Sequence, residues 1–443
     1  MTECTSEKLS FKRYFRQQVV ADFNGGEITS DAGALLLREA DQKLGLTKAV
    51  SSCFVDPRQS GKVKHSVTEM IRQRVYGIAL GYEDLNDHDT LRDDELMKLV
   101  VESKEPLASA PTLCRFENWV DRETLLRISE VFVASFMASF DTPPEELVLD
   151  FDATDDEVHG MQECRFFHGY YDSYCFLPLY VFCGKKLLAA YLRPSKIDAA
   201  KHSWAILSLL VKRLRGRWPG VRIIIRGDSG FARWKMMRWC DLHGVNYILG
   251  IAKNKRLNAK SAGLREEAAK ELEQTGQKQR LFGEFRYAAH TWDRQRRVIV
   301  KAEHSQQGEN PRYIVTNLDG DAQELYDNSY CARGEMENRI KEQQKDLFAD
   351  RTSAHRFVAN QLRVLLASAA YILLEYVRSE GLCGTELAKA QCGTIRLKLL
   401  KIGARIVKSV RRVVVHLATG YPYRAILRRV LERLRAAPAR APL

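Results

Sequence analysis

The stretch Leu147-Val148-Leu149-Asp150-Phe151-Asp152-Ala153-Thr154 decides the fold, because it is a short apolar run that ends in carboxylates. Residues 174–183 and 186–192 predict two further strands that pair as a hairpin, and the apolar run 221–225 ends at Arg226-Gly227-Asp228. Helical patterns flank this last run. Three strands followed by alternating helix and strand predict an α/β sheet with an antiparallel edge and a parallel centre.

The segments before and after these strands differ from them in composition and in the spacing of apolar residues. Before Pro143-Pro144 apolar residues recur at helical steps, and 254–311 is polar and charged with two β-like runs. We therefore expect five regions along the chain. They are a helical N-terminal domain that is either a scaffold or a candidate for DNA-end binding (1–143), the first part of an α/β core (144–253), a partly β insertion domain (254–311), the second part of the core with the helix that carries Glu337 (312–393), and a basic C-terminal region (394–443).

The net charge indicates a polyanionic partner. The chain of 443 residues carries 69 Lys and Arg against 56 Asp and Glu, which leaves +13. Most of this excess lies in 394–443, where there are thirteen Lys or Arg and a single acid, Glu432. The apolar residues of that region fit a helix in part and a hairpin in part, so both forms stay open. In either form we expect Arg405, Lys408, Arg411 and Arg412 to contact DNA phosphates.

Other classes are disfavoured by composition. The longest strongly apolar run, 364–374, is shorter than the ~20 residues that a membrane span needs, so it predicts a buried helix. The N-terminus has no signal-peptide core, and we expect a cytoplasmic protein with no membrane partner and with reduced cysteines. The absence of a C-x-x-C pair argues against a zinc site.

Two carboxylates follow buried strands. Asp152 ends one strand and Asp228 ends another, at the sheet edge where active sites of α/β proteins lie. A helix predicted from about residue 322 places Tyr330, Arg333 and Glu337 on one face, with Lys341 one turn further. A third carboxylate from this helix would complete an oxygen-rich site suited to Mg²⁺. A salt-bridged surface helix is the alternative.

Three blocks of the sequence resemble the signature of the DDE transposases of bacterial insertion sequences. They are Asp152-Ala153-Thr154, Gly227-Asp228-Ser229-Gly230-Phe231 and Tyr330-x2-Arg333-x3-Glu337. The segments 23–33 and 167–172 are similar to further hallmarks of the thirteen-eighty insertion-sequence family, a relative of the insertion-sequence-four group. The resemblance covers nearly the whole chain and implies an RNase H-like (retroviral-integrase-like) core, with an insertion domain between the second Asp and the Glu.

The resemblance also implies the chemistry. Asp152, Asp228 and Glu337 would be the catalytic residues and would bind two Mg²⁺ ions, with Mn²⁺ as a substitute, for DNA cleavage and strand transfer in cut-and-paste transposition. The partners would be double-stranded DNA with the terminal inverted repeats of its own element, target DNA and a second copy in a synaptic homodimer, at the nucleoid when DNA is bound.

Individual DNA contacts follow from the same resemblance. Tyr330 and Arg333 would contact DNA, and the family signature has a lysine seven residues after the Glu, where this chain has Gln344. Lys341 and Lys345 are therefore the candidates for a phosphate-binding lysine. Hairpin formation on the excised end would need an aromatic residue to hold a flipped base, and Trp292 is the candidate. A core tryptophan is the alternative interpretation.

Rival enzymes fit less well. Asp150 and Asp152 also match the opening motif of haloacid-dehalogenase-type phosphatases, but Phe231 and Ala232 stand where a second acidic pair is needed. Ser229 lacks the G-x-S-x-G elbow of serine hydrolases. An RNase H-like nuclease and a catalytically silent, transposase-derived DNA-binding protein stay open as alternatives.

Overall fold

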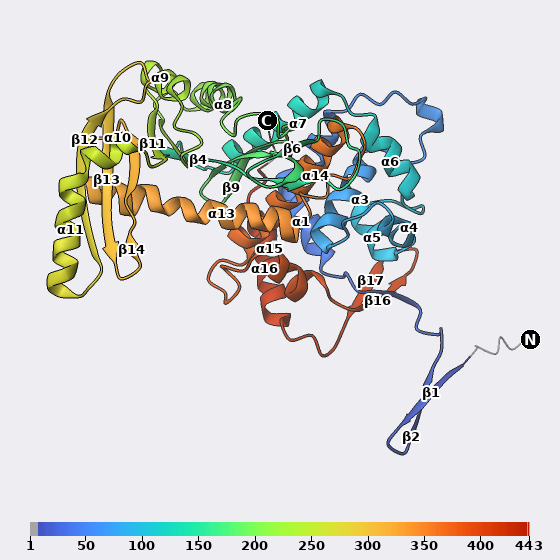
Figure 1. The fold of residues 1–443 in the computed structure, drawn as a ribbon. Helices are drawn as coiled ribbons and strands as arrows, with labels where there is room; N and C mark the ends of the chain where they lie inside the picture. Colours follow the sequence, from blue (N-terminus) through green and yellow to red (C-terminus); the bar gives the residue numbers. More distant parts are fainter. Residues whose placement is uncertain (1–7, 441, 443) are drawn as a thin grey trace, which may run out of the picture. The chain divides into compact units, whose positions relative to one another are not determined.

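The computed structural model describes residues 8–440 and 442, which divide into two compact units. Unit 1 comprises residues 8–119 and 369–439, so it contains segments from both ends of the chain. Unit 2 comprises residues 120–368 together with 440 and 442. Figure 1 shows the elements of both units along the chain, and each unit is described by itself.

Unit 2 is built on a sheet that has the predicted antiparallel edge and parallel centre. Its strands β4 (Glu146–Ala153), β10 (Arg222–Gly227) and β11 (Asn246–Ile251) are parallel. Strand β8 (Leu179–Cys183) pairs antiparallel with β4, and β9 (Lys186–Tyr191) pairs antiparallel with β8. The order β11-β10-β4-β8-β9 confirms the mixed α/β class. A smaller sheet, in the order β5-β7-β6, follows β4 and consists of β5 (Asp156–Glu157), β6 (Phe166–His168) and β7 (Ser173–Phe176).

The charged segment after β11 continues this sheet. Its strands β12 (Gln279–Tyr287) and β13 (Arg296–Ser305) join through β15 (Arg312–Thr316), which pairs with β11; β14 (Gly308–Glu309) pairs with β13. The two β-like runs predicted there are therefore strands, but they extend the main sheet and do not form a sheet of their own. Val298, Ile299 and Val300 explain why, because consecutive buried apolar residues need cover on both faces. Helices α10 (Lys255–Lys260) and α11 (Ala262–Thr275) precede these strands.

Different helices cover the two faces of the main sheet. On one face, apolar residues of α7 (Arg122–Ala138), α8 (Ser203–Arg217) and α9 (Trp234–Leu242) form a large core with strand residues such as Leu149 and Ile225. On the other face, Ile224, Ile248 and Ile314 pack with Tyr326 of a long helix. This helix runs through α12 (Ala322–Glu324), the π-helical turn η2 (Leu325–Tyr330), the 3₁₀ turn η3 (Cys331–Arg333), α13 (Gly334–Lys341) and the π-helical turn η4 (Glu342–Asp346).

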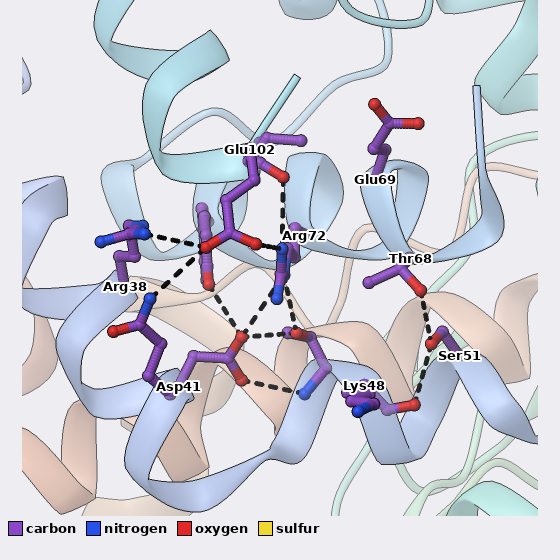
Figure 2. Close-up of polar contacts among 12 residues, drawn as sticks. Arg38, Asp41, Lys48, Ser51, Thr68, Glu69, Arg72 and Glu102 are labelled. Carbon is purple, nitrogen blue, oxygen red and sulfur yellow. Dashed lines mark hydrogen bonds and ion pairs between the residues drawn. The ribbon is translucent and has the colours of Figure 1, made fainter. Parts of the chain in front are cut away.

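Unit 1 is mainly helical after residue 33, and its N-terminal segment ends at Trp119, so α7 of the predicted domain 1–143 belongs to unit 2. Its N-terminal helices are α1 (Ala34–Leu44), α2 (Leu46–Ser52), α3 (Val67–Leu80), α4 (Asp87–Leu91), α5 (Glu95–Val101) and α6 (Ala110–Asn118), with the 3₁₀ turn η1 (Ser60–Lys62). Figure 2 shows the polar network that links α1, α2 and α3 with Glu102, the residue that follows α5. The buried carboxylate of Asp41 accepts hydrogen bonds from Thr47 and from the Tyr76 hydroxyl at 2.9 Å, and Arg72 donates to Glu102 at 2.6 Å.

The C-terminal region completes unit 1 with both helix and hairpin. It contains α15 (Cys392–Ile395), the π-helical turn η6 (Arg396–Leu400), the strands β16 (Ala404–Lys408) and β17 (Val413–Leu417), and α16 (Arg424–Ala436). Strand β16 also pairs with β3 (Glu27–Thr29), a strand that the helical prediction for 1–143 missed. Gly33, just before α1, lies close against η6, because a Cβ atom there would be 1.9 Å from the Leu399 carbonyl oxygen.

Two more features complete the description. A separate hairpin, β1 (Leu9–Tyr14) with β2 (Gln17–Ala21), lies near the N-terminus, and the helical prediction missed it as well. The helix formed by α14 (Phe357–Tyr376) and η5 (Val377–Gly381) is long and apolar enough to span a membrane by length and composition. Because 78% of its apolar window is buried inside the protein, we interpret it as the predicted core helix.

Candidate active site

The two aspartates lie side by side at the ends of adjacent parallel strands. Gly227 of β10 is in register with Phe151 of β4, so the next residues in the chain, Asp228 and Asp152, are neighbours at the same edge. Side chains alternate between the faces of a strand, which puts Asp152 on the face covered by the η2–α13 helix. The strand patterns thus bring together the two carboxylates that the sequence singles out.

Arg333 connects the helix to the first of these carboxylates. Its guanidinium lies 3.4 Å from Asp152 Oδ2 and donates a hydrogen bond of 3.0 Å to Glu337 Oε1. Arg333 and Glu337 are four residues apart, which places them on one helical face as predicted. The guanidinium is largely buried, while half of the Glu337 side chain is exposed. Asp152 and Glu337 therefore share one cation.

Tyr330 reaches the same edge from the η2 turn. A Cβ atom on Gly250 of β11 would lie 2.6 Å from the Tyr330 hydroxyl and 3.3 Å from the carbonyl carbon of Asp228. Only glycine therefore leaves room for this tyrosine beside the strand end. Burial raises the pKa of Tyr330, and the charge of Asp228 raises it further. The phenol is a neutral hydrogen-bonding group next to the carboxylates.

The pKa of Asp152 reflects its burial and the charged groups around it. Burial is the largest cause that raises the pKa of Asp152, from 3.8 to about 7; Arg333 opposes the shift, and the charges of Asp228 and Glu337 add to it. A buried carboxylate beside two others carries more negative charge than a single guanidinium balances. Perturbed carboxyl groups of this kind are typical of functional sites.

The described residues contain no group of three His, Cys, Asp or Glu side chains that is arranged to hold a metal ion. The position between Asp152 and Glu337 is taken by the Arg333 guanidinium. The donor chemistry nevertheless fits Mg²⁺ or Mn²⁺, because three carboxylates provide hard oxygen ligands and carry more negative charge than the single guanidinium of Arg333 balances.

Asp150 has a different partner and does not belong to the carboxylate group. It is buried, and Arg226 binds it through two hydrogen bonds, one of them at 2.7 Å from Nη2 to Oδ2. The same guanidinium donates to the Ser329 carbonyl oxygen in η2. This contact argues against Asp150 as a nucleophile. Sequence reasoning missed the pair, although an arginine within the apolar run 222–227 is a signal that could have revealed it.

Gln344 binds the backbone where the family signature has a lysine. Its side-chain amide donates a hydrogen bond of 2.8 Å to the Asp155 carbonyl oxygen, in the loop that follows β4. This bond ties the end of the helix to the strand that carries Asp152. Lys341 and Lys345, the two candidates for phosphate contact, are both exposed on the helix.

Trp292 belongs to another part of unit 2, and the basic residues singled out in the C-terminal region belong to unit 1. Trp292 is half-buried in the loop between β12 and β13, where it packs against the core of unit 2 and edge-to-face on Tyr287 at 5.5 Å. These are the contacts of a core tryptophan, the alternative considered above. The exposed residues Arg405, Lys408, Arg411 and Arg412 belong to the β16–β17 hairpin of unit 1, where Lys408 forms an ion pair with Glu95.

Comparisons with known proteins give one family. The family model described as Transposase DDE domain group 1 matches residues 11–439. A cryo-EM structure of the piggyBac transposase synaptic complex with hairpin DNA has 12% sequence identity over 84% of this chain and 80% of that chain, with a TM-score of 0.43. A likeness this weak decides neither fold nor function. No protein of curated function matches the sequence.

Proposed function

Because the chain belongs to the family of DDE transposases, we propose that it cleaves DNA at the ends of an insertion sequence and joins those ends to target DNA by cut-and-paste transposition. One observation carries the proposal at the level of residues. Asp152 and Asp228 end adjacent parallel strands, and Arg333 links Asp152 to Glu337 on the helix that covers them. We assign these three carboxylates as the catalytic residues.

Asp152, Asp228 and Glu337 would hold two divalent cations, Mg²⁺ or in its place Mn²⁺. When bound, such ions activate water or a DNA 3′-hydroxyl and stabilise the leaving oxygen of an in-line displacement. Because Asp152 and Asp228 stand at the ends of paired strands, their carboxylates are held in fixed positions. Asp152 must lose its proton before it can act as a ligand. Its raised pKa makes this step dependent on pH near neutrality.

Arg333, Tyr330 and the exposed lysines would bind the DNA strand. Arg333 can exchange its carboxylate partners for phosphate oxygens, since a guanidinium binds both through similar paired hydrogen bonds. The Tyr330 hydroxyl offers a neutral donor beside Asp228, and Lys341 and Lys345 extend the same helix toward solvent. On unit 1, Arg405, Lys408, Arg411 and Arg412 would contact DNA phosphates. Trp292, whose contacts are those of a core residue, would hold a flipped base only through the part of its ring that is exposed.

The finer assignments are part of the same proposal. The strand order of the central sheet is that expected of an RNase H-like core, and the sequence hallmarks favour the thirteen-eighty insertion-sequence family of bacteria. The DNA partners would be the terminal inverted repeats of its own element and a target duplex. We expect a homodimer in the synaptic complex, acting at the nucleoid.

The experiment is metal-dependent nicking of a duplex that carries the inverted repeat of the element. The wild-type protein should nick and then join this DNA in Mg²⁺, and Asp228→Asn should bind it without nicking. Asp319→Asn, which changes an exposed carboxylate of the same unit, is the matched control and should retain activity. If the wild type binds and does not cut, the protein is a catalytically silent DNA-binding protein. Cleavage that ignores the end sequence and gives no joined product would identify a nuclease instead.

A further inference from the structure

The β1–β2 hairpin has no partner within the described chain. Every residue from 8 to 28 is exposed, including the large side chains of Phe11 (57%), Tyr14 (64%) and Phe15 (86%). A two-stranded hairpin is at best marginally stable in water unless another surface covers it. The hairpin lies largely inside the region that the family model matches, residues 11–439. It is therefore a surface that another molecule could complete.

The pairing register sorts its side chains onto two faces. Leu9 pairs with Ala21, Phe11 with Val19 and Tyr14 with Gln17, and partners opposite each other share a face. A register shift between Phe11 and Tyr14 keeps Leu9, Phe11 and Tyr14 on the same face although they are not evenly spaced. The result is a ribbon with one apolar and aromatic face, on which the side chains are exposed.

The charge of the ribbon favours a polyanion as the occupant. Residues 8–21 contain four cations and no acid. These cations are Lys8, Lys12, Arg13 and Arg16, and all four are exposed. A second copy of the chain would have to supply both an apolar surface and matching acids. Duplex DNA offers phosphates along both rims of a groove, with apolar sugar walls between them.

The tip carries an aromatic residue in an unusual backbone conformation. Phe15, at the turn, has a φ of 52°, which bulky side chains rarely adopt, and it is the most exposed of the aromatic residues of the ribbon. Proteins that bind the minor groove often insert apolar side chains between base steps and read few polar groups. The apolar face and the tip of this ribbon fit that groove better than the polar base edges of the major groove.

We propose that the β1–β2 ribbon binds in the minor groove of duplex DNA, with Lys12, Arg13 and Arg16 on phosphates and Phe15 inserted at a base step. The inference rests on the proposed function only for the nature of the ligand, DNA. It does not involve the carboxylate site. It gives the DNA-binding role considered for 1–143 to a β-ribbon, where the sequence predicted a helical domain.

The test measures binding of the full-length protein to a fluorescein-labelled 30-base-pair duplex in EDTA, so cleavage plays no part. Replacing Lys12, Arg13 and Arg16 with Gln should weaken binding about tenfold or more and lower the log–log salt slope by up to about 2.7. The matched control replaces three exposed lysines of α10 and α11, Lys255, Lys260 and Lys270, with Gln, and should leave the slope unchanged.

Phe15→Ala provides a second readout. Energy transfer between dyes at the two ends of the duplex should report bending with the wild-type protein and less bending with Phe15→Ala, while Phe15→Leu should restore most of it. An unchanged salt slope in the triple variant overturns the proposal. A second result also overturns it: in the absence of DNA the triple variant sediments as a smaller species than the wild type, while its affinity for DNA is unaltered. The ribbon would then join two copies of the chain. Loss of nicking in Asp228→Asn is independent of all these outcomes.

Discussion

At the scale of single residues, Asp152 makes the stability of the protein depend on pH. Its pKa in the folded chain is about 7, raised first by burial and then by Asp228 and Glu337, with Arg333 opposing. Because this pKa lies above the ordinary value of 3.8, the folded chain binds more protons than the unfolded chain between the two values. The stability contributed by this group is present below about pH 4 and is lost as the pH rises to about 7.

Asp152→Asn should therefore stabilise the protein at pH 8, by about 1 to 4 kcal/mol, and by progressively less as the pH falls toward 4. The measurement is thermal unfolding of both proteins across this range in the presence of a chelator. Glu157→Gln, which replaces an exposed carboxylate, should show no such trend. An equal Tm difference between wild type and Asp152→Asn at every pH would contradict the account of the site.

Arg226 should contribute strongly to the stability of the fold, although it does not belong to the carboxylate site, because it binds the buried carboxylate of Asp150. Arg226→Met leaves the buried carboxylate of Asp150 without its cation, which we expect to cost about 3 to 5 kcal/mol in the free energy of unfolding. Adding Asp150→Leu should restore most of the loss. Arg222→Met, in the same strand but half exposed, is the control and should change stability by less than about 1 kcal/mol. Denaturant unfolding measures all three.

The site was predictable where short-range patterns decide it. Asp152 and Asp228 follow apolar runs, so strand ends could be inferred from the residues alone, and the spacing of Arg333 and Glu337 gives a shared helix face. Arg226 in an apolar run signals a buried anionic partner, but the identity of that partner, Asp150, is set by the sheet register across 76 positions of sequence. The bond from Gln344 to the Asp155 carbonyl also depends on tertiary packing.

At the scale of elements, the packing of β11 against the η2 turn fixes the position of Tyr330. Gly250→Ala would place a Cβ atom 2.6 Å from the tyrosine hydroxyl and 3.1 Å from the Ser229 backbone nitrogen. The tyrosine ring can move, but the backbone beside Asp228 has less freedom. We expect a loss of about 1 to 3 kcal/mol in stability and a larger fractional loss in nicking rate than in DNA affinity.

Gly220→Ala is the matched control for this change, because a Cβ atom there would meet nothing within 4 Å. Both variants are compared by thermal unfolding, DNA binding and single-turnover nicking. A Gly250→Ala protein that nicks at the wild-type rate would show that Tyr330 need not hold its place beside Asp228.

Helices and strands with regularly spaced apolar residues could be predicted from the sequence. Elements without such spacing could not. The strands of the central sheet and the helices of unit 1 follow from apolar spacing. The π-helical turns η2 and η4 were not expected, since an extra residue per turn leaves no clear sequence pattern. The β1–β2 ribbon escaped detection because its apolar residues are exposed and interrupted by a register shift, so they mark no core.

At the scale of the whole molecule, part of the C-terminal charge has a structural role. Arg396 donates to the Ala79 carbonyl oxygen at 2.9 Å, Lys401 pairs with Asp31 at 2.7 Å and Lys408 pairs with Glu95. Deleting 394–443 would therefore remove part of the core of unit 1 along with its charge. Substituting exposed residues of the β16–β17 hairpin changes the charge of this region without removing that core.

Replacing Arg405, Arg411 and Arg412 with Gln should lower the salt slope of DNA binding by up to about 2.7, because each phosphate contact contributes about 0.9. The Tm should stay within about 2 °C of the wild type, since these side chains are exposed. The measurement is a titration of labelled duplex at several salt concentrations in EDTA. The Lys255, Lys260 and Lys270 variant again serves as the control. An unaltered slope would remove this hairpin from the DNA-binding surface.

The sheet β17-β16-β3 has a consequence for how the protein is made. Strand β3 leaves the ribosome early, but its partner β16 ends at Lys408, so this sheet cannot close until almost the whole chain has been synthesised. At about 5 to 20 residues per second this wait lasts tens of seconds. Unit 2 is nearly continuous in sequence, so it can fold before the β17-β16-β3 sheet closes. A polypeptide truncated by a late frameshift would therefore carry the carboxylates on a finished sheet beside an unfinished unit 1, exposed to cellular proteases.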